Sequence, residues 1–123
     1  MGTVFTNTGR ALLTDALNNT QLTSPVYIGW GTGTTAAAAT QTALVTPSAE
    51  SRTSGTKSRT TTTVTNDTYQ VVGTITSSSS QTIAEAGLFD ASTSGNMYVR
   101  GDFTGIALGN GDSITFTVKV VIA

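Results

Sequence analysis

The last segment of the chain alternates apolar side chains with mostly polar ones. Apolar residues recur there at every second position: Ile114, Phe116, Val118, Val120 and Ile122. Side chains on a strand point alternately to its two faces, so this spacing gives one apolar and one mostly polar face. The pattern predicts a β-strand that packs on a core with its apolar face.

The same period of two, interrupted by Gly, Asn, Asp and Ser, runs through much of the remaining chain. It predicts further strands over residues 25–30, 59–65, 69–76, 83–90 and 97–103. From residue 59 onward turn signals return about every 8–12 residues, which is typical of a sandwich or barrel. The expected fold is therefore mainly β, a single antiparallel β-sandwich domain of jelly-roll-like type.

Residues 7–19 are the one credible helix. Asn7 or Thr8 is expected to cap its start, and an asparagine at its end suits the left-handed position that closes a helix. Its apolar stripe consists of Leu12, Leu13, Ala16 and Leu17. A helix of this length is not stable alone and must dock on a partner surface. A short helical turn is expected over residues 36–45.

Two stretches are expected to be exposed. Residues 1–10 are interpreted as an N-terminal arm and residues 46–59 as a long loop, because long loops in compact domains are commonly functional or mobile. A third loop is expected over residues 105–111. Glu50 and Arg52 are either solvated or paired with a neighbouring subunit. The candidate partner-binding residues are Thr3, Phe5, Arg10, Glu50, Arg52, Lys57 and Arg59.

Glu85 is the carboxylate with the most informative surroundings, because it lies within an apolar strand. A buried carboxylate needs a partner, and Arg100 lies on the strand predicted to return beside it. A bulge near Gly87 would bring the two together. We favour a structural pair over a surface position, and either over a catalytic acid.

Composition removes several classes of function. The chain has no Cys and no His, so it lacks thiol ligands, disulfides and the commonest general base. Its formal net charge is -1 and only 11% of its residues are charged. Such a chain has no field that attracts nucleic acid or an anionic membrane, and little that repels a second copy. The first ten residues predict no secretory signal, and no apolar run predicts a membrane span.

No motif predicts catalysis or a cofactor. The glycine-rich turn after residue 30 lacks the Lys-Ser/Thr pair of a phosphate loop, and no stretch carries the oxygen ligands of a calcium site. A glycosidase would need two facing carboxylates. Trp30 and the tyrosines are expected to pack in the core rather than to form a sugar-stacking platform. We therefore expect no enzyme, no catalytic residue, no metal and no cofactor.

Two segments carry a resemblance to a known group of proteins. Residues 27–45 read YIGWGTGTTAAAATQTALV, and residues 85–122 contain EAGLFDA, GNMYVRGDF and LGNGDSITFTVKVVI. Together they resemble small structural proteins of tailed bacteriophages, such as head decoration (cement) proteins and modules of tail fibres. That group often has an acidic residue soon after the TxL element, where this chain has Thr46, Pro47 and Ser48.

The resemblance implies a jelly-roll-like sandwich that assembles as a trimer on the capsid exterior and staples the major capsid protein after the shell expands. The leading hypothesis is accordingly a non-enzymatic capsid decoration protein, made in the host cytoplasm and incorporated into the virion. The alternative is a tail-fibre or tail-tip module, with Trp30 and the tyrosines exposed to bind host carbohydrate. A glycan hydrolase is the third class considered.

Overall fold

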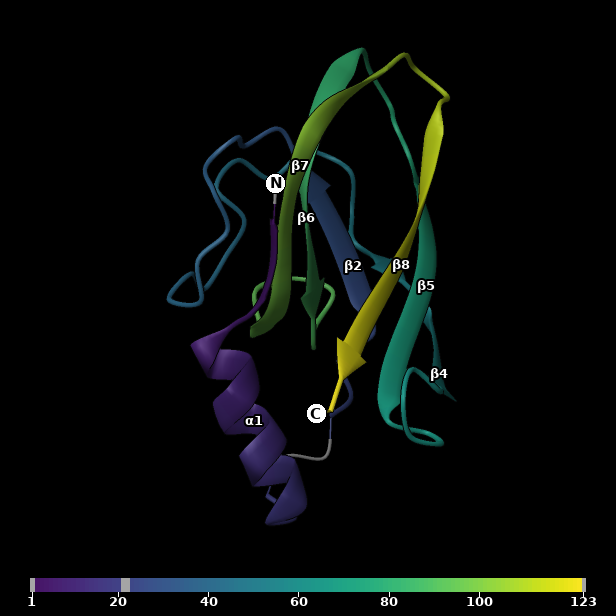
Figure 1. The fold of residues 1–123 in the computed structure, drawn as a ribbon. Coiled ribbons are helices and arrows are strands. Elements are labelled where there is room, and N and C mark those ends of the chain that lie inside the picture. Colours follow the sequence, from purple (N-terminus) through teal and green to yellow (C-terminus); the bar gives the residue numbers. More distant parts are fainter. Residues whose placement is uncertain (1, 21–22, 123) are drawn as a thin grey trace.

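A computed structural model describes residues 2–20 and 23–122, which form two antiparallel sheets and one helix (Figure 1). The five-stranded sheet has the order β1 (Gly2–Phe5), β7 (Met97–Leu108), β6 (Gln81–Phe89), β2 (Tyr27–Gly31) and β3 (Thr53–Ser54). The three-stranded sheet has the order β4 (Thr56–Thr60), β5 (Thr68–Thr76) and β8 (Ser113–Val121). The helix α1 spans Asn7–Leu17. The predicted β-sandwich with one short helix is confirmed.

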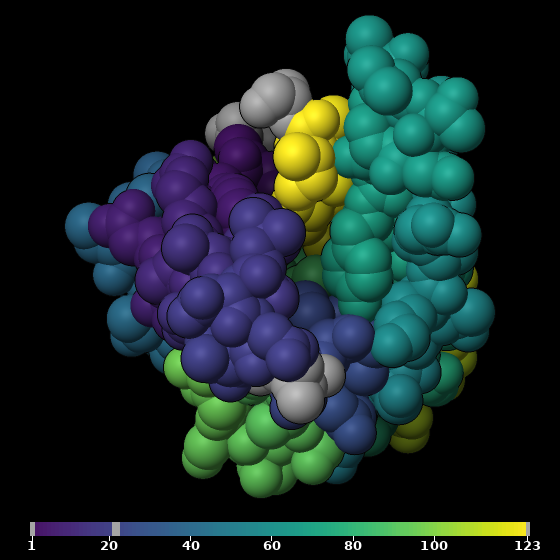
Figure 2. Space-filling view, turned by 90° about the horizontal axis from the view of Figure 1, so that it is seen from below, coloured from purple at the N-terminus to yellow at the C-terminus, as the bar shows by residue number. Residues whose placement is uncertain are grey.

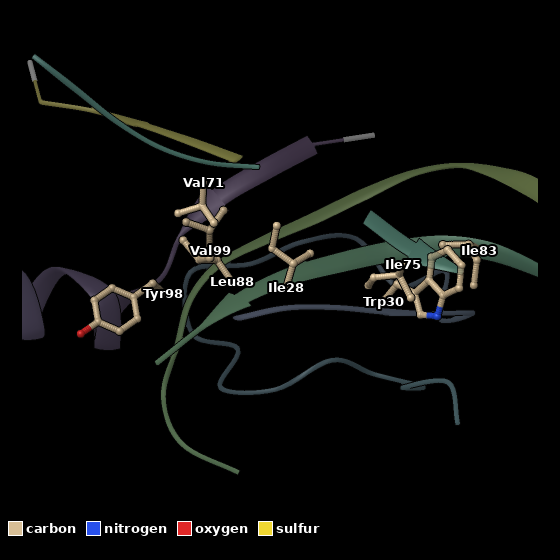
Figure 3. Close-up of a cluster of buried hydrophobic side chains, with 8 residues drawn as sticks. All are labelled: Ile28, Trp30, Val71, Ile75, Ile83, Leu88, Tyr98 and Val99. Atoms are coloured by element: carbon tan, nitrogen blue, oxygen red, sulfur yellow. The ribbon is translucent and has the colours of Figure 1, made fainter. Parts of the chain in front are cut away.

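The core lies between the two sheets. Ile28, Leu88 and Val99 project from the five-stranded sheet against Val71 and Ile75 from β5 (Figure 3). The alternation that predicted β8 is confirmed, since its even-numbered residues face this core and its odd-numbered residues are exposed. In Figure 3 Tyr98 lies at the end of the core cluster away from Trp30, Ile75 and Ile83.

The predicted helix is present, and its start is fixed by a buried threonine. The Thr6 hydroxyl accepts a hydrogen bond from the Gly9 N–H at 2.9 Å and donates one to the Met97 carbonyl at 2.6 Å. Thr6 is therefore the cap, in place of Asn7 or Thr8. Asn19 has the left-handed conformation expected after the helix, with φ 61°. Gly9 is the buried residue of α1, so the helix is held mainly near its start.

The N-terminal segment is not a free arm. Residues 2–5 form β1, which pairs with β7 from Gly2 opposite Asp102 to Phe5 opposite Val99, and α1 follows directly. The apolar residues of this short segment are better satisfied at the sheet edge than in solvent. The arm predicted over residues 1–10 was therefore wrong for its described residues, which belong to the folded domain.

The loop predicted over residues 46–59 was partly wrong, because it contains β3 and most of β4. Gly55 joins these strands, and its N–H donates to the Val26 carbonyl at 2.7 Å. A side chain at this position would clash with Val71 and the Val72 carbonyl, so glycine lets the chain pass from one sheet to the other. The polar strand predicted over residues 59–65 corresponds to β4, but its residues lack a clear alternation and its start at Thr56 was not predicted.

Other boundaries also differ from the sequence predictions. Residues 36–45 contain only turns and bends, so the expected helical turn was wrong. The strand predicted over residues 59–65 was mostly wrong, because β4 ends at Thr60. β7 continues to Leu108, into the predicted loop over residues 105–111. No helix within residues 2–20 and 23–122 is long and apolar enough to cross a membrane.

Candidate interaction surface

Glu85 and Arg100 form an ion pair on the face of the five-stranded sheet that points away from the core. Arg100 lies opposite Gly87, so Glu85 is its diagonal neighbour on the adjacent strand. The Arg100 Nη2 and Nε atoms donate to Glu85 Oε1 at 2.9 and 3.1 Å, and both side chains are 0% exposed. The bulges in this strand pair lie at Ile83/Glu85 and Leu88/Phe89, not at Gly87.

The segment of residues 32–52, called here the covering loop, lies over this ion pair. Glu85 Oε2 accepts from the Thr46 and Gly33 N–H groups at 2.7 and 3.0 Å, and Oε1 accepts from the Val45 N–H at 2.9 Å. Burial acts to raise the pKa of Glu85, but the hydrogen bonds from Thr46, Val45, Arg100 and Gly33 outweigh it and lower the pKa. The carboxylate is therefore held ionised under the loop.

The glycine-rich turn after Trp30 makes room for that carboxylate. A side-chain carbon at Gly33 would lie 2.5 Å from Glu85 Oε2, and one at Gly31 would meet Glu85 Oε2 and the Thr46 carbonyl. Arg100 completes the attachment, because its Nη1 donates to the Thr35 carbonyl at 3.0 Å and to Gln41 Oε1 at 3.1 Å. The glycine-rich turn thus encloses the Glu85 carboxylate of the same chain.

Glu50 and Arg52, candidates for partner binding, make their contacts within the chain. Glu50 Oε1 accepts from Trp30 Nε1 at 2.8 Å and from Gln81 Nε2 at 3.0 Å. The Arg52 guanidinium lies 3.5 Å from the centre of the Phe89 ring and donates to carbonyls of the 91–94 turn. Both side chains therefore fasten the end of the covering loop.

The remaining candidates divide between two edges of the molecule. Lys57 and Arg59 lie on the edge strand β4, where Lys57 donates to Ser24 Oγ at 3.1 Å. Trp30 is 2% exposed and packs edge-on against Phe116, with ring centres 6.3 Å apart. It is a core residue, which contradicts the exposed sugar platform of the alternative hypothesis. Thr3, Phe5 and Arg10 lie together at the opposite edge.

Acid is expected to weaken the attachment of the covering loop by the Glu50 carboxylate. Burial acts to raise its pKa, but hydrogen bonds from Ser78, Trp30 and Gln81 outweigh this and hold the pKa at about 2, below the ordinary 4.5. A lowered pKa means that the carboxylate stabilises the fold fully above pH 4.5 and loses this effect as pH falls toward 2. We expect the melting temperature of wild type to fall more steeply than that of Glu50→Gln between about pH 6 and about pH 3.

The comparison isolates Glu50, because both proteins share every other carboxylate, including Asp67, whose pKa is lowered by backbone hydrogen bonds from Val64, Thr62 and Thr63. Differential scanning calorimetry across this pH range measures the two slopes. Parallel slopes would show that the Glu50 hydrogen bonds do not contribute to stability.

The sandwich is closed on one side and open on the other. It is closed where β3 contacts β5 and continues through Gly55 into β4. On the open side β8 and β1 are the edge strands of their sheets. Between them lies a hollow of about 570 Å³, called here the β1–β8 groove, lined by Thr3, Val4, Phe5, Arg10, Leu13, Val99, Lys119, Val120, Val121 and Ile122.

An adjoining hollow of about 270 Å³ continues the groove beneath the helix, between Leu12, Ala16, Tyr69 and Tyr98. Figure 2 shows this depression between α1 and the C-terminal strand. Its lining is almost wholly apolar. Burial first, and then nearby Asp90, Tyr69 and Asp15, raise the pKa of Tyr98 to about 12. The groove and this hollow together form a largely apolar surface that the described residues leave uncovered.

Three of the seven partner-binding candidates, Thr3, Phe5 and Arg10, line this groove. Sequence reasoning missed Lys119 and the C-terminal residues of the opposite wall. One sequence signal for the groove was present: the apolar stripe of the helix, of which Leu12, Leu13 and Ala16 line the groove or the adjoining hollow. The number and order of strands in each sheet, which place β8 and β1 at sheet edges, could not be read from the sequence.

Fold and groove together define a small β-sandwich module with one incompletely covered side. The family model described as Podophage GP4 fiber I protein gp80 matches residues 4–122. The chain therefore belongs to this family and is a structural protein of tailed bacteriophages, a component of the virion. No curated protein and no solved structure matches the chain. The predicted phage structural class is confirmed, and the match names a fiber protein, not a head decoration protein.

Proposed function

We propose that the protein is a non-enzymatic structural subunit of a virion fibre. The observation that carries this proposal is the match of a fiber-protein family over residues 4–122, nearly the whole chain. It favours the fibre alternative over the capsid decoration hypothesis, because the matched description names a fiber protein. The groove adds support, since a subunit of an assembly needs an uncovered surface through which other chains attach.

The buried charges of the molecule also suit a scaffolding role. Glu85 and Arg100 are enclosed by the covering loop, so neither is available to a substrate. Within the described residues, no group of three or more His, Cys, Asp or Glu is placed to hold a metal ion. Within the described residues the fold presents a partly apolar groove at its open side, which is suited to assembly with other chains.

Copy number in purified virions tests the location. Quantitative mass spectrometry measures this protein against the major capsid protein, and a fibre subunit is expected at a many-fold lower level. Gold-labelled antibody against the protein is expected to decorate fibres in electron micrographs. A near-stoichiometric ratio with label over the shell would restore the decoration hypothesis, and absence from virions would contradict both.

A further inference from the structure

The strand that borders the groove has an unpaired edge along its whole length. All nine residues of β8 pair with β5 on one side, and no strand within the described residues pairs with the other side. Its inward side chains remain half-buried, including Phe116 and Val118, although they pack against the core. An edge strand of this length with a partly covered apolar face is suited to receive an additional strand.

The five-stranded sheet extends beneath the free edge of β8. Val99 of β7 and Phe5 of β1 form the floor of the groove, and Val120 lies on the facing wall. Next to these residues Phe103 and Phe116 extend the apolar lining along the same side, with ring centres 6.3 Å apart. A strand added to β8 would therefore lie over an existing apolar floor and complete the sandwich there.

The charges that line the β1–β8 groove indicate which kind of chain it can bind. Arg10 lines the groove from the helix and Lys119 from β8, whereas no carboxylate among the described residues lines it. Neither cation forms an ion pair within the described part of the chain. Two copies meeting groove to groove would bring both pairs of cations together without a compensating acid, which is unfavourable. An acidic occupant would be attracted.

We propose that the β1–β8 groove binds an extended acidic segment of a partner protein, which adds to β8 as a strand. Alternate apolar side chains of that segment fill the space over Phe5 and Val99, and its carboxylates face Arg10 and Lys119. The proposal rests on the proposed function only in taking the partner to be another virion protein. The groove itself is a property of the isolated chain.

A synthetic peptide tests the proposal directly. The probe has nine residues, the length of β8, with Val at every second position and Glu between. Fluorescence anisotropy of the labelled peptide at low salt measures its affinity for the protein. The double variant Arg10→Glu/Lys119→Glu is expected to bind about tenfold or more weakly. The same variant is expected to bind a peptide with Lys in place of Glu, and wild type is expected not to bind that peptide.

The other edge of the same sheet supplies the matched control. Lys57→Glu/Arg59→Glu reverses two cations on β4, whose edge does not line the groove, and is expected to leave binding unchanged. If Arg10→Glu disturbs folding through its hydrogen bond to the Phe5 carbonyl, Lys119→Glu alone carries the test. Hydrogen exchange is expected to slow at backbone amides of β8 when the Glu peptide is bound.

Several results would overturn the proposal: no binding of the Glu peptide, equal binding to the reversed variant, or equal sensitivity to the β4 reversal. Analytical ultracentrifugation addresses a second copy as occupant. Wild-type self-association that Val120→Lys abolishes would assign the groove to a second copy and contradict an acidic partner. Failure of fibre labelling would instead contradict the proposed location and leave the peptide result standing.

Discussion

Arg100→Met is expected to lower the free energy of unfolding by about 3 kcal/mol, because removing one partner of a buried pair leaves the other charge uncompensated. Glu85 is 0% exposed and would keep its three backbone donors but lose the cation with which it pairs. The covering loop would also lose the two hydrogen bonds that Arg100 donates to Thr35 and Gln41. Urea unfolding followed by tryptophan fluorescence measures the loss, since Trp30 lies in the core.

Two further variants serve as controls for the Arg100→Met measurement. Glu85→Gln/Arg100→Met removes both charges and is expected to be more stable than Arg100→Met alone, since no isolated charge stays buried. Arg59→Met changes an exposed arginine on β4 and is expected to alter stability by less than about 0.5 kcal/mol. A stability of Arg100→Met equal to that of Arg59→Met would show that the ion pair is not a significant part of the fold.

Gly9→Val is expected to detach α1 from the sandwich and to cost about 2 kcal/mol, the usual range for forced overpacking. A side-chain carbon at Gly9 would lie 2.8 Å from the Tyr98 carbonyl oxygen and 2.7 Å from the Phe5 ring. Backbone cannot yield as a flexible side chain can, so the helix must move. Gly9 is the fully buried residue of the helix, so loss of that contact leaves a short, weakly attached helix that is unstable alone.

Far-UV circular dichroism and thermal melting measure this effect. Ala11→Val is the matched control, since it introduces the same β-branched side chain at an exposed position of the same helix. It is expected to cost only the small difference in helix propensity, about half a kcal/mol. Equal melting temperatures for the two variants would show that the contact of Gly9 with Tyr98 does not hold the helix.

Strands with a clear period of two were predictable from the sequence, whereas the bounds of the polar strand β4 were not. β8 follows its alternation because one face must leave water. β4, with the sequence TKSRT, has no apolar face to reveal it, and it forms because β5 offers a partner along Thr56–Thr60. The alanines before residue 40 favour a helix by propensity, but the Ala37 N–H donates to Asp102 and the Ala39 carbonyl accepts from the Asn7 N–H, which holds this stretch in another conformation.

The site was predictable to a similar extent. An acidic residue within an apolar strand implied a partner, and Arg100 is that partner at 2.9 Å. That the pair lies under a loop could not be inferred, because the loop reaches it through backbone groups that carry no sequence signal. The groove depends on which strands remain at the sheet edges, a property of topology. Thr3, Phe5 and Arg10 were nominated for an arm and lie in this groove instead.

The attachment of the covering loop has a consequence for how this surface can vary. Its hydrogen bonds to the buried pair use the backbone of Gly33, Thr35, Val45 and Thr46, together with the side chain of Gln41. Most side chains between these points are exposed. Their identities can therefore diverge among related chains while the scaffold beneath stays the same. A subunit built in this way can acquire a new outer face by substitution alone, without redesign of its core.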